Sequence, residues 1–249
     1  MSLRIAVVTE HAEDFEIATE LADRVFCDAL KQSLDEEWIP YQRVWLNTLP
    51  SGHPLTWTNI KRSALEADVR PHGRFNGESA EPDARAARRA ILYLRQSYPD
   101  LAGVLLIRDQ DDQPLRLKGI NQARDREPQN LAIVIGLAIV ERESWVLSGY
   151  NPLSEAEESL LQSEISRVSL DPRTHSHRLD DHKSLTAQLS PKRALTALTG
   201  NNFERERQCW RTTPLATLRQ RGTENGLTAY LDEVRTKLAL LIGHIPPRQ

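Results

Sequence analysis

The stretch that decides the fold reads LAGVLLIRDQDD and runs from Leu101 to Asp112. Its first seven residues are apolar, and an arginine and three aspartates follow within five positions. A short apolar run that ends in charged residues is typical of a strand buried on both faces of a parallel sheet. Two further runs of similar character occur at 3–9 (LRIAVVT) and 131–140 (LAIVIGLAIV). We therefore expect three buried strands.

Helical patterns separate these strands. Apolar residues recur three and four positions apart over 15–29 and 84–94, and a shorter helix is expected over 117–126. A further strand is expected over 38–46, where Pro40 favours the edge of a sheet. Parallel neighbours need crossover connections, and helices that alternate with strands supply them. The expected fold class is α/β, with a mostly parallel sheet that helices flank.

The composition of the chain changes after about residue 149. Residues 1–149 contain the strand patterns and form the expected α/β core, with a polar insertion rich in glycine and proline at 47–81. Residues 150–249 are polar and show helical patterns, including an acidic helix over 154–165 and an apolar stripe over 227–242. We expect this second region to be a helical extension that packs on the core.

The overall charge and the motif content exclude several classes of protein. The 249 residues include 32 basic and 35 acidic side chains, so a uniformly basic nucleic-acid coat protein is excluded and contact with nucleic acid must be local. Two cysteines, far apart in sequence, match no zinc-ligand spacing. No phosphate-binding loop, dinucleotide fingerprint or hydrolase serine elbow occurs. Without a signal peptide or a long apolar run, the chain is expected to be cytoplasmic and to make no membrane contact.

Acidic residues follow the three expected buried strands. They are Glu10, Asp109, Asp111, Asp112, Glu141 and Glu143. Ligands of open parallel sheets bind outside the carboxyl ends of the strands, where these acids are expected to gather. Carboxylate oxygens suit Mg²⁺ or Mn²⁺, and crowded carboxylates require a cation or a shared proton. The alternative is that each acid is a solvated loop residue or a helix cap.

Basic residues surround the expected acidic centre. The candidates for contact with nucleic acid are Arg88, Arg108, Arg116 and Lys118. A metal-binding centre ringed by cations is the expected pattern of a phosphodiester-cleaving site, with phosphates held by the basic side chains. The alternative is an ordinary solvated helix face. A separate cluster, His175, His177 and His182 with two aspartates, could bind zinc or manganese, but its spacing indicates a loop rather than an aligned set of ligands.

These residues resemble the Toprim family, which includes topoisomerase, primase and OLD-type nuclease domains. The matching pieces are Val7-Val8-Thr9-Glu10 after the first strand and the Asp109-Gln-Asp111 pair after a later strand. Glu143-Ser144-Trp145 is similar to the Glu-x-Trp element of small stand-alone Toprim-like proteins, many of which are encoded beside ATPases in bacterial defence loci. His11 stands where the family usually has a glycine.

The resemblance implies a Mg²⁺-dependent nuclease that acts as the effector of an antiviral defence system together with an ATPase partner. It implies that Glu10 is the general acid/base or a metal ligand and that Asp109 and Asp111 hold Mg²⁺ or Mn²⁺. Asp112 and Glu143 would take supporting metal-binding roles. Two alternatives remain open, an inactive Toprim-like interaction or regulatory module and a phosphohydrolase of small molecules.

Overall fold

A computed structural model describes residues 2–30, 36–71, 73–75, 77–127, 130–181 and 186–243. The chain forms two compact units, each built from separate stretches of sequence. The first unit comprises Met1–Arg108, Gln113–Gly136 and Asp232–Gln249, and the second comprises Asp109–Asp112 and Leu137–Leu231. Within the described ranges, no helix combines the length and the apolar character that crossing a membrane requires.

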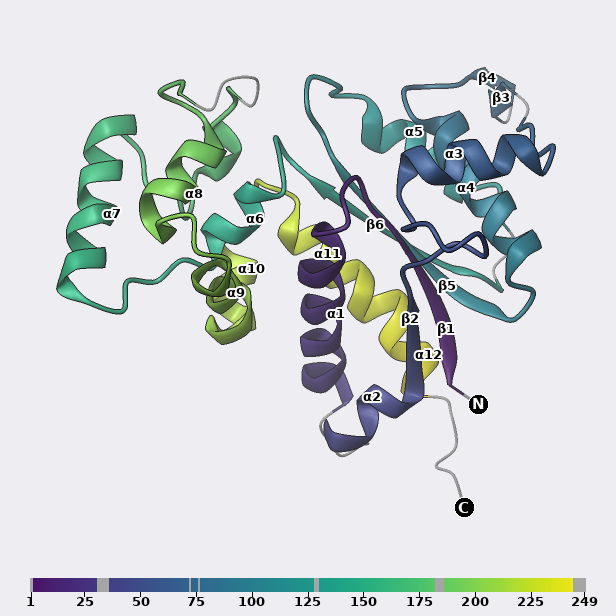
Figure 1. Ribbon diagram of the computed structural model, residues 1–249, viewed down its shortest axis with the longest axis horizontal. Coiled ribbons are helices and arrows are strands. Elements are labelled where there is room, and N and C mark those ends of the chain that lie inside the picture. The colour runs from purple at the N-terminus through teal and green to yellow at the C-terminus, as the bar shows by residue number, and fades with distance from the viewer. Residues whose placement is uncertain are drawn as a thin grey trace. The chain divides into compact units, whose positions relative to one another are not determined.

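A four-stranded parallel sheet forms the centre of the first unit (Figure 1). Its order is β2-β1-β5-β6, and the strands are β1 (Leu3–Val8), β2 (Arg43–Leu46), β5 (Leu101–Asp109) and β6 (Ala132–Ala138). The expected α/β class with a parallel sheet is confirmed. Val8 of β1 lies opposite Leu106 of β5, so the carboxyl ends of these two strands reach the same edge of the sheet.

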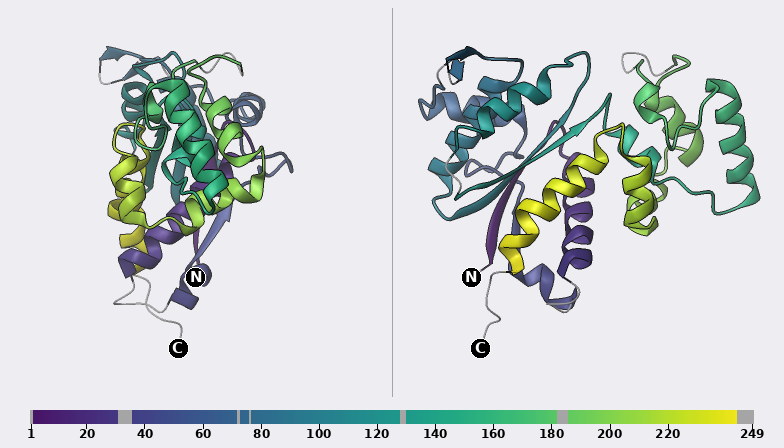
Figure 2. Two further views of the ribbon diagram at one scale, coloured as in Figure 1. Left: turned by 90° about the vertical axis from the view of Figure 1, so that its left-hand side faces the viewer. Right: turned by 180° about the vertical axis from the view of Figure 1, so that it is seen from behind.

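Helices cover both faces of this sheet (Figures 1 and 2). On one face lie α1 (Asp14–Leu30) and, packed against it, the π-helical turn η3 (Val234–Leu238) and α12 (Ala239–Gly243). On the other face, α4 (Ala84–Ser97) packs against both α3 (Trp57–Glu66) and α5 (Arg116–Arg124). The buried apolar residues of α1 fall on one side of the helix, as the spacing of three and four predicts.

The strand expected over 38–46 is wrong in its first half. The residues form a 3₁₀ turn, η1 (Glu36–Trp38), and a short helix, α2 (Ile39–Gln42), before β2 begins. Pro40 lies in the first turn of α2, where a missing N–H costs no helical hydrogen bond. The insertion contains α3 and a small hairpin of β3 (Arg74–Phe75) and β4 (Glu78–Ser79).

The second unit is helical. Its elements are α6 (Glu143–Ser148), α7 (Glu155–Val168), η2 (Ser176–Arg178), α8 (Pro191–Thr199), α9 (Phe203–Thr212), α10 (Leu215–Arg221) and the start of α11 (Leu227–Glu233). Helix α6 is central and packs against η2, α8 and α9. Asn225, only 1% exposed, joins these parts because its side-chain nitrogen lies 2.8 Å from the Ser144 carbonyl and 2.9 Å from Ser176 Oγ.

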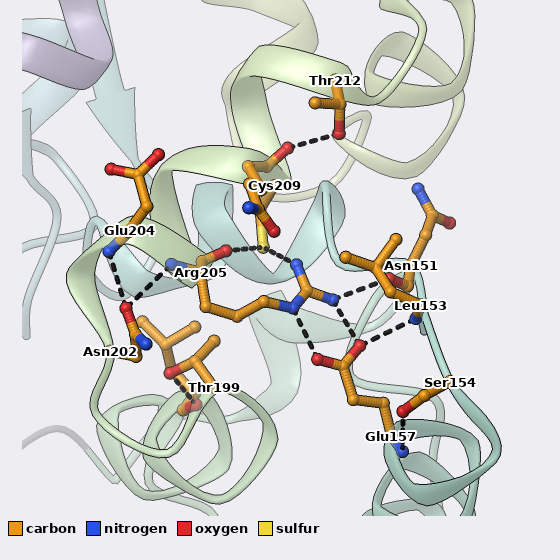
Figure 3. A network of polar contacts seen from close by, with 12 residues as sticks. Asn151, Leu153, Ser154, Glu157, Thr199, Asn202, Glu204, Arg205, Cys209 and Thr212 are labelled. Carbon is orange, nitrogen blue, oxygen red and sulfur yellow. Dashed lines mark hydrogen bonds and ion pairs between the residues drawn. The ribbon is translucent and has the colours of Figure 1, made fainter.

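An arginine-centred network fastens α9 to the start of α7 (Figure 3). The guanidinium of Arg205 donates to both carboxylate oxygens of Glu157, at 2.8 and 2.9 Å, and to the Asn151 carbonyl at 2.7 Å. It also lies over the ring of Tyr150, 4.6 Å from the centroid. The hydrogen bond from Arg205 lowers the pKa of Glu157 against the opposing effect of burial. The pair is therefore ionised at neutral pH and stabilises the second unit.

Candidate functional site

Two acidic loops of the second unit are hydrogen-bonded to each other through their backbones. The amide of Gln110 donates to the carbonyl of Ala138 at 2.8 Å, and that of Asp111 donates to the carbonyl of Val140 at 3.2 Å. Asp111 and Val140 both have left-handed backbones, with φ of 47° and 70°. This conformation is strained for a β-branched valine and persists only where the surroundings impose it. The loop after β5 is thus held against the residues that follow β6.

Lys192 is the counter-ion of this acidic region. Its Nζ lies 2.6 Å from Oε1 of Glu141, whose side chain is only 6% exposed. Burial lowers the pKa of Lys192, but the hydrogen bond to Glu141 and the charges of Glu143, Glu141 and Asp109 outweigh it and raise the pKa overall. Lys192 therefore carries its charge at neutral pH. One ammonium group therefore contacts Glu141 and is affected by the charges of carboxylates in both acidic loops.

The start of α8 positions this lysine. Ser190 caps the helix by accepting a hydrogen bond from the amide of Arg193, and Pro191 occupies the first turn. Lys192 was not among the site residues predicted from the sequence. The only local signal is a basic residue in the first turn of a helix, where it opposes the helix dipole. Such a placement requires an acidic neighbour elsewhere in the fold.

A second set of charges borders the first. Arg142 Nη2 lies 3.4 Å from Oε1 of Glu143 and 3.7 Å from Oε2 of Glu206. Glu206 is 5% exposed, and burial raises its pKa, with the negative charge of Glu143 adding to the effect despite Arg142. The region therefore carries more carboxylates than cations. It is the environment in which a carboxyl group binds a proton or a metal cation more readily than in water.

The predicted metal ligands differ in their placement. The charges of Asp109 and Glu143 both raise the pKa of Lys192. Asp111 is half-buried, and its amide is bonded to Val140, whereas Asp112 is exposed. In the part of the chain that the structure describes, no three carboxylate, imidazole or thiolate groups converge as a metal-binding set. The carboxylates present are the hard oxygen donors that Mg²⁺ prefers, and Mg²⁺ commonly takes only one or two of them with water completing its shell. The donor set fits such a site.

Glu10 lies in the first unit, directly after β1. Its Oε1 is 3.4 Å from Nε of Arg108, which also pairs with Asp83 at 2.9 Å. The next residue, His11, donates its amide to Oδ2 of Asp14 at 3.0 Å, at the start of α1. His11 does not adopt a left-handed backbone conformation, so no glycine is required at this position.

Each predicted cation at the nucleic-acid surface has a carboxylate partner within the first unit. Arg88 pairs with Glu127, Arg108 with Glu10 and Asp83, Arg116 with Asp83, and Lys118 with Glu81. The Lys118 side chain is 56% exposed, whereas that of Arg116 is only 8% exposed. Arg116 is therefore positioned mainly to neutralise Asp83, and Lys118 is the more accessible of the two.

Two of the three histidines in the cluster predicted from the sequence are among the described residues. His175 and His177 lie with ring centroids 6.1 Å apart, and His182 is outside the described residues. Burial lowers the pKa of His177, so this imidazole is neutral at pH 7. As far as the described residues go, this loop belongs to no metal-binding set.

The chain was compared with family models, curated proteins and solved structures. No family model, no curated protein and no solved structure matches the chain.

Proposed function

We propose that this protein is a Mg²⁺-dependent nuclease of the Toprim type. The observation that supports the proposal most strongly is the pair of acidic loops after β5 and β6, joined by the backbone of Gln110 and Asp111. Lys192 pairs with Glu141, and the charges of carboxylates from both loops raise its pKa. Acidic residues outside the carboxyl ends of parallel strands are placed where α/β folds bind their ligands.

Asp109 and Asp111 are the proposed metal ligands, with Glu143 and Asp112 in supporting roles. A bound Mg²⁺ would polarise the phosphodiester and lower the pKa of a coordinated water. The two aspartates are separated by one residue, and the chain turns at Asp111, which has a left-handed backbone. The strained turn fixes the loop before any cation binds, so little ordering would be needed on binding.

Lys192 would hold the substrate. Its charge at neutral pH attracts a phosphate oxygen, and its side chain is 38% exposed, which leaves the ammonium within reach of a ligand. By binding Glu141 it also reduces the repulsion between the carboxylates and an approaching phosphate. Glu10 has the general acid/base role that the Toprim resemblance implies, and Arg108 orients its carboxylate.

The resemblance also places this nuclease in a bacterial antiviral defence system with an ATPase partner. The chain has no phosphate-binding loop of its own, so a partner of that kind would supply the hydrolysis of ATP. The rival proposal is a catalytically inactive interaction module. It is favoured by the lack of three converging metal ligands among the described residues and by the lysine that already neutralises Glu141.

Metal binding and strand cleavage distinguish the two proposals. We expect Mn²⁺ or Mg²⁺ to bind the wild-type protein and the double variant D109N/D111N to lose both binding and cleavage of end-labelled DNA or RNA. Asp125, whose side chain is 64% exposed, provides the control D125N, which should behave as wild type. Absence of divalent-cation binding in the calorimeter, or cleavage that survives D109N/D111N, would contradict the nuclease. Cleavage of mononucleotides but not of polynucleotides would indicate the small-molecule phosphohydrolase.

A further inference from the structure

The first unit contains a cleft of ≈ 660 Å³. Its walls come from α3, the residues before α4, the first turns of α4 and the side chain of Arg108. Helices α3 and α4 pack against each other in this unit (Figure 1). The lining residues are Trp57, Thr58, Ile60, Lys61, Ala80, Glu81, Pro82, Asp83, Arg85, Ala86, Arg89 and Arg108. Small-molecule sites have volumes of about 300–1,000 Å³.

The acidic groups of this cleft are already neutralised. Asp83 pairs with Arg108 at 2.9 Å and with Arg116 at 2.5 Å, and Glu81 pairs with Lys118 at 2.6 Å. These partners leave the remaining cations of the cleft without competing carboxylates. The cleft therefore has an excess of positive charge, and an anion is the ligand that its charge selects.

Three cations of the cleft remain uncompensated. Lys61 on α3 and Arg85 and Arg89 on α4 form no ion pair with any residue that the structure describes. Nε of Arg89 is buried and has no hydrogen-bond acceptor among the same residues. A buried donor without an acceptor is costly, and more so on a charged group.

The start of α4 adds to the attraction for an anion. Asp83 precedes the helix with φ of 64°, and its side chain makes no capping hydrogen bond to the first turn. The carboxylate instead binds Arg108 and Arg116. The amide of Ala84 donates to the carbonyl of Glu81 at 3.1 Å, and the positive end of the helix dipole, on the turn that carries Arg85, adds to the attraction for an anion.

Apart from Thr58, the rest of the lining is apolar. Trp57, Ile60, Pro82 and Ala86 border the cleft beside the cations. Inorganic phosphate alone would not use this surface, whereas an organic phosphate would bury its base or sugar against it. We propose that the cleft binds a nucleotide, with its phosphates on Lys61, Arg85 and Arg89. The cleft and the proposed nuclease centre share Arg108, which lines the cleft and pairs with Glu10, but the nucleotide proposal stands whether or not the protein cleaves nucleic acid.

Calorimetric titration with ATP, ADP and adenosine tests this assignment. Wild-type protein should bind ATP more tightly than ADP, should bind adenosine at least tenfold more weakly, and should lose affinity as salt is raised. Arg89→Gln should weaken ATP binding at least tenfold, or about 1.4 kcal/mol, because it removes one charge-assisted contact.

Neighbouring residues on α3 provide a matched pair of variants. Lys61→Gln removes a cation of the cleft and should weaken ATP binding. Arg62→Gln removes an exposed cation that does not line the cleft, so its affinity for ATP should stay within about twofold of wild type. Circular dichroism checks that the variants are folded. The inference is overturned if ATP fails to bind at millimolar concentration, if adenosine binds as well as ATP, or if Arg89→Gln binds ATP normally. Binding of a DNA strand but not of ATP would also overturn it.

Discussion

Replacing Lys192 by methionine should destabilise the protein, because it removes the counter-charge of the acidic loops. The Glu141 carboxylate is 6% exposed and lies 2.6 Å from the ammonium, while Glu143 and Asp109 contribute like charges to the same region. Methionine keeps most of the length of the side chain and removes only the charge and the donors. The variant therefore isolates the electrostatic contribution.

The size of the effect follows from burial. Removing one partner of a fully buried ion pair costs about 3–5 kcal/mol. The Lys192 side chain is 38% exposed, so solvent screens part of the interaction and the expected loss is about 2 kcal/mol. For a chain of this length, such a loss lowers Tm by about 4–8 °C. Because the pKa of Lys192 is raised above its usual 10.5 in the fold, the difference from wild type should be fully present below about pH 10.5 and should shrink as the pH rises above that value.

Thermal unfolding followed by circular dichroism measures this effect, with Arg193→Gln as the matched control. Arg193 is the next residue on α8, and its guanidinium donates to the carbonyl of Thr186 at 2.8 Å without facing a carboxylate in the described structure. It should lower Tm by less than about 2 °C. Equal Tm values for wild type and Lys192→Met, or an equal loss in the control, would refute the role assigned to Lys192. Addition of Mg²⁺ should raise the Tm of Lys192→Met more than that of wild type.

Three further outcomes are expected in unfolding experiments. Arg205→Gln breaks the bidentate pair with Glu157 and should lower the free energy of unfolding by about 2–3 kcal/mol at pH 7. Because the pKa of Glu157 is lowered in the fold, this contribution should fade as the pH falls below about 4.5. Persistence of the full contribution at pH 3 would contradict the assignment. Glu206→Gln should raise the free energy of unfolding at pH 7. The raised pKa of Glu206 makes the wild type lose stability as the pH rises above about 4.5, and the variant has no such carboxyl group. A lower free energy of unfolding for the variant than for wild type at pH 7 would contradict this prediction. Gly119→Ala places a methyl group against the carbonyl of Pro82, so denaturant titration should show a loss of about 1–3 kcal/mol rather than the gain of about 1 kcal/mol that helix propensity alone predicts.

The strands buried on both faces could be predicted from the sequence because such strands must be apolar throughout. The runs at 3–9, 101–107 and 131–140 therefore correspond to β1, β5 and β6. The residues 38–42 could not be assigned in this way. Pro40 is compatible both with an edge strand and with the first turn of a helix, and the structure contains the helix.

The acidic part of the candidate site could be predicted for the same reason, since strand ends are recognisable. Asp109 ends β5, Glu143 begins the helix after β6, and the charges of both raise the pKa of Lys192. Lys192 could not be predicted, because it lies 51 positions from Glu141 and reaches it only through the packing of α8 against α6. The cleft beside Arg89 was missed because it depends on which arginines of α4 already have carboxylate partners. Arg88 and Arg95 both pair with Glu127, which follows α5, whereas Arg85 and Arg89 form no ion pair with the residues that the structure describes.

Crystals grown with Mn²⁺ and measured at the manganese absorption edge provide the most direct test of the proposed nuclease centre. We expect an anomalous peak within about 2.0–2.5 Å of carboxylate oxygens of Asp109 or Asp111, and no such peak in D109N/D111N. Density that shows these carboxylates without metal at saturating Mn²⁺, with Lys192 still bound to Glu141, would contradict the metal-dependent nuclease and favour an interaction module.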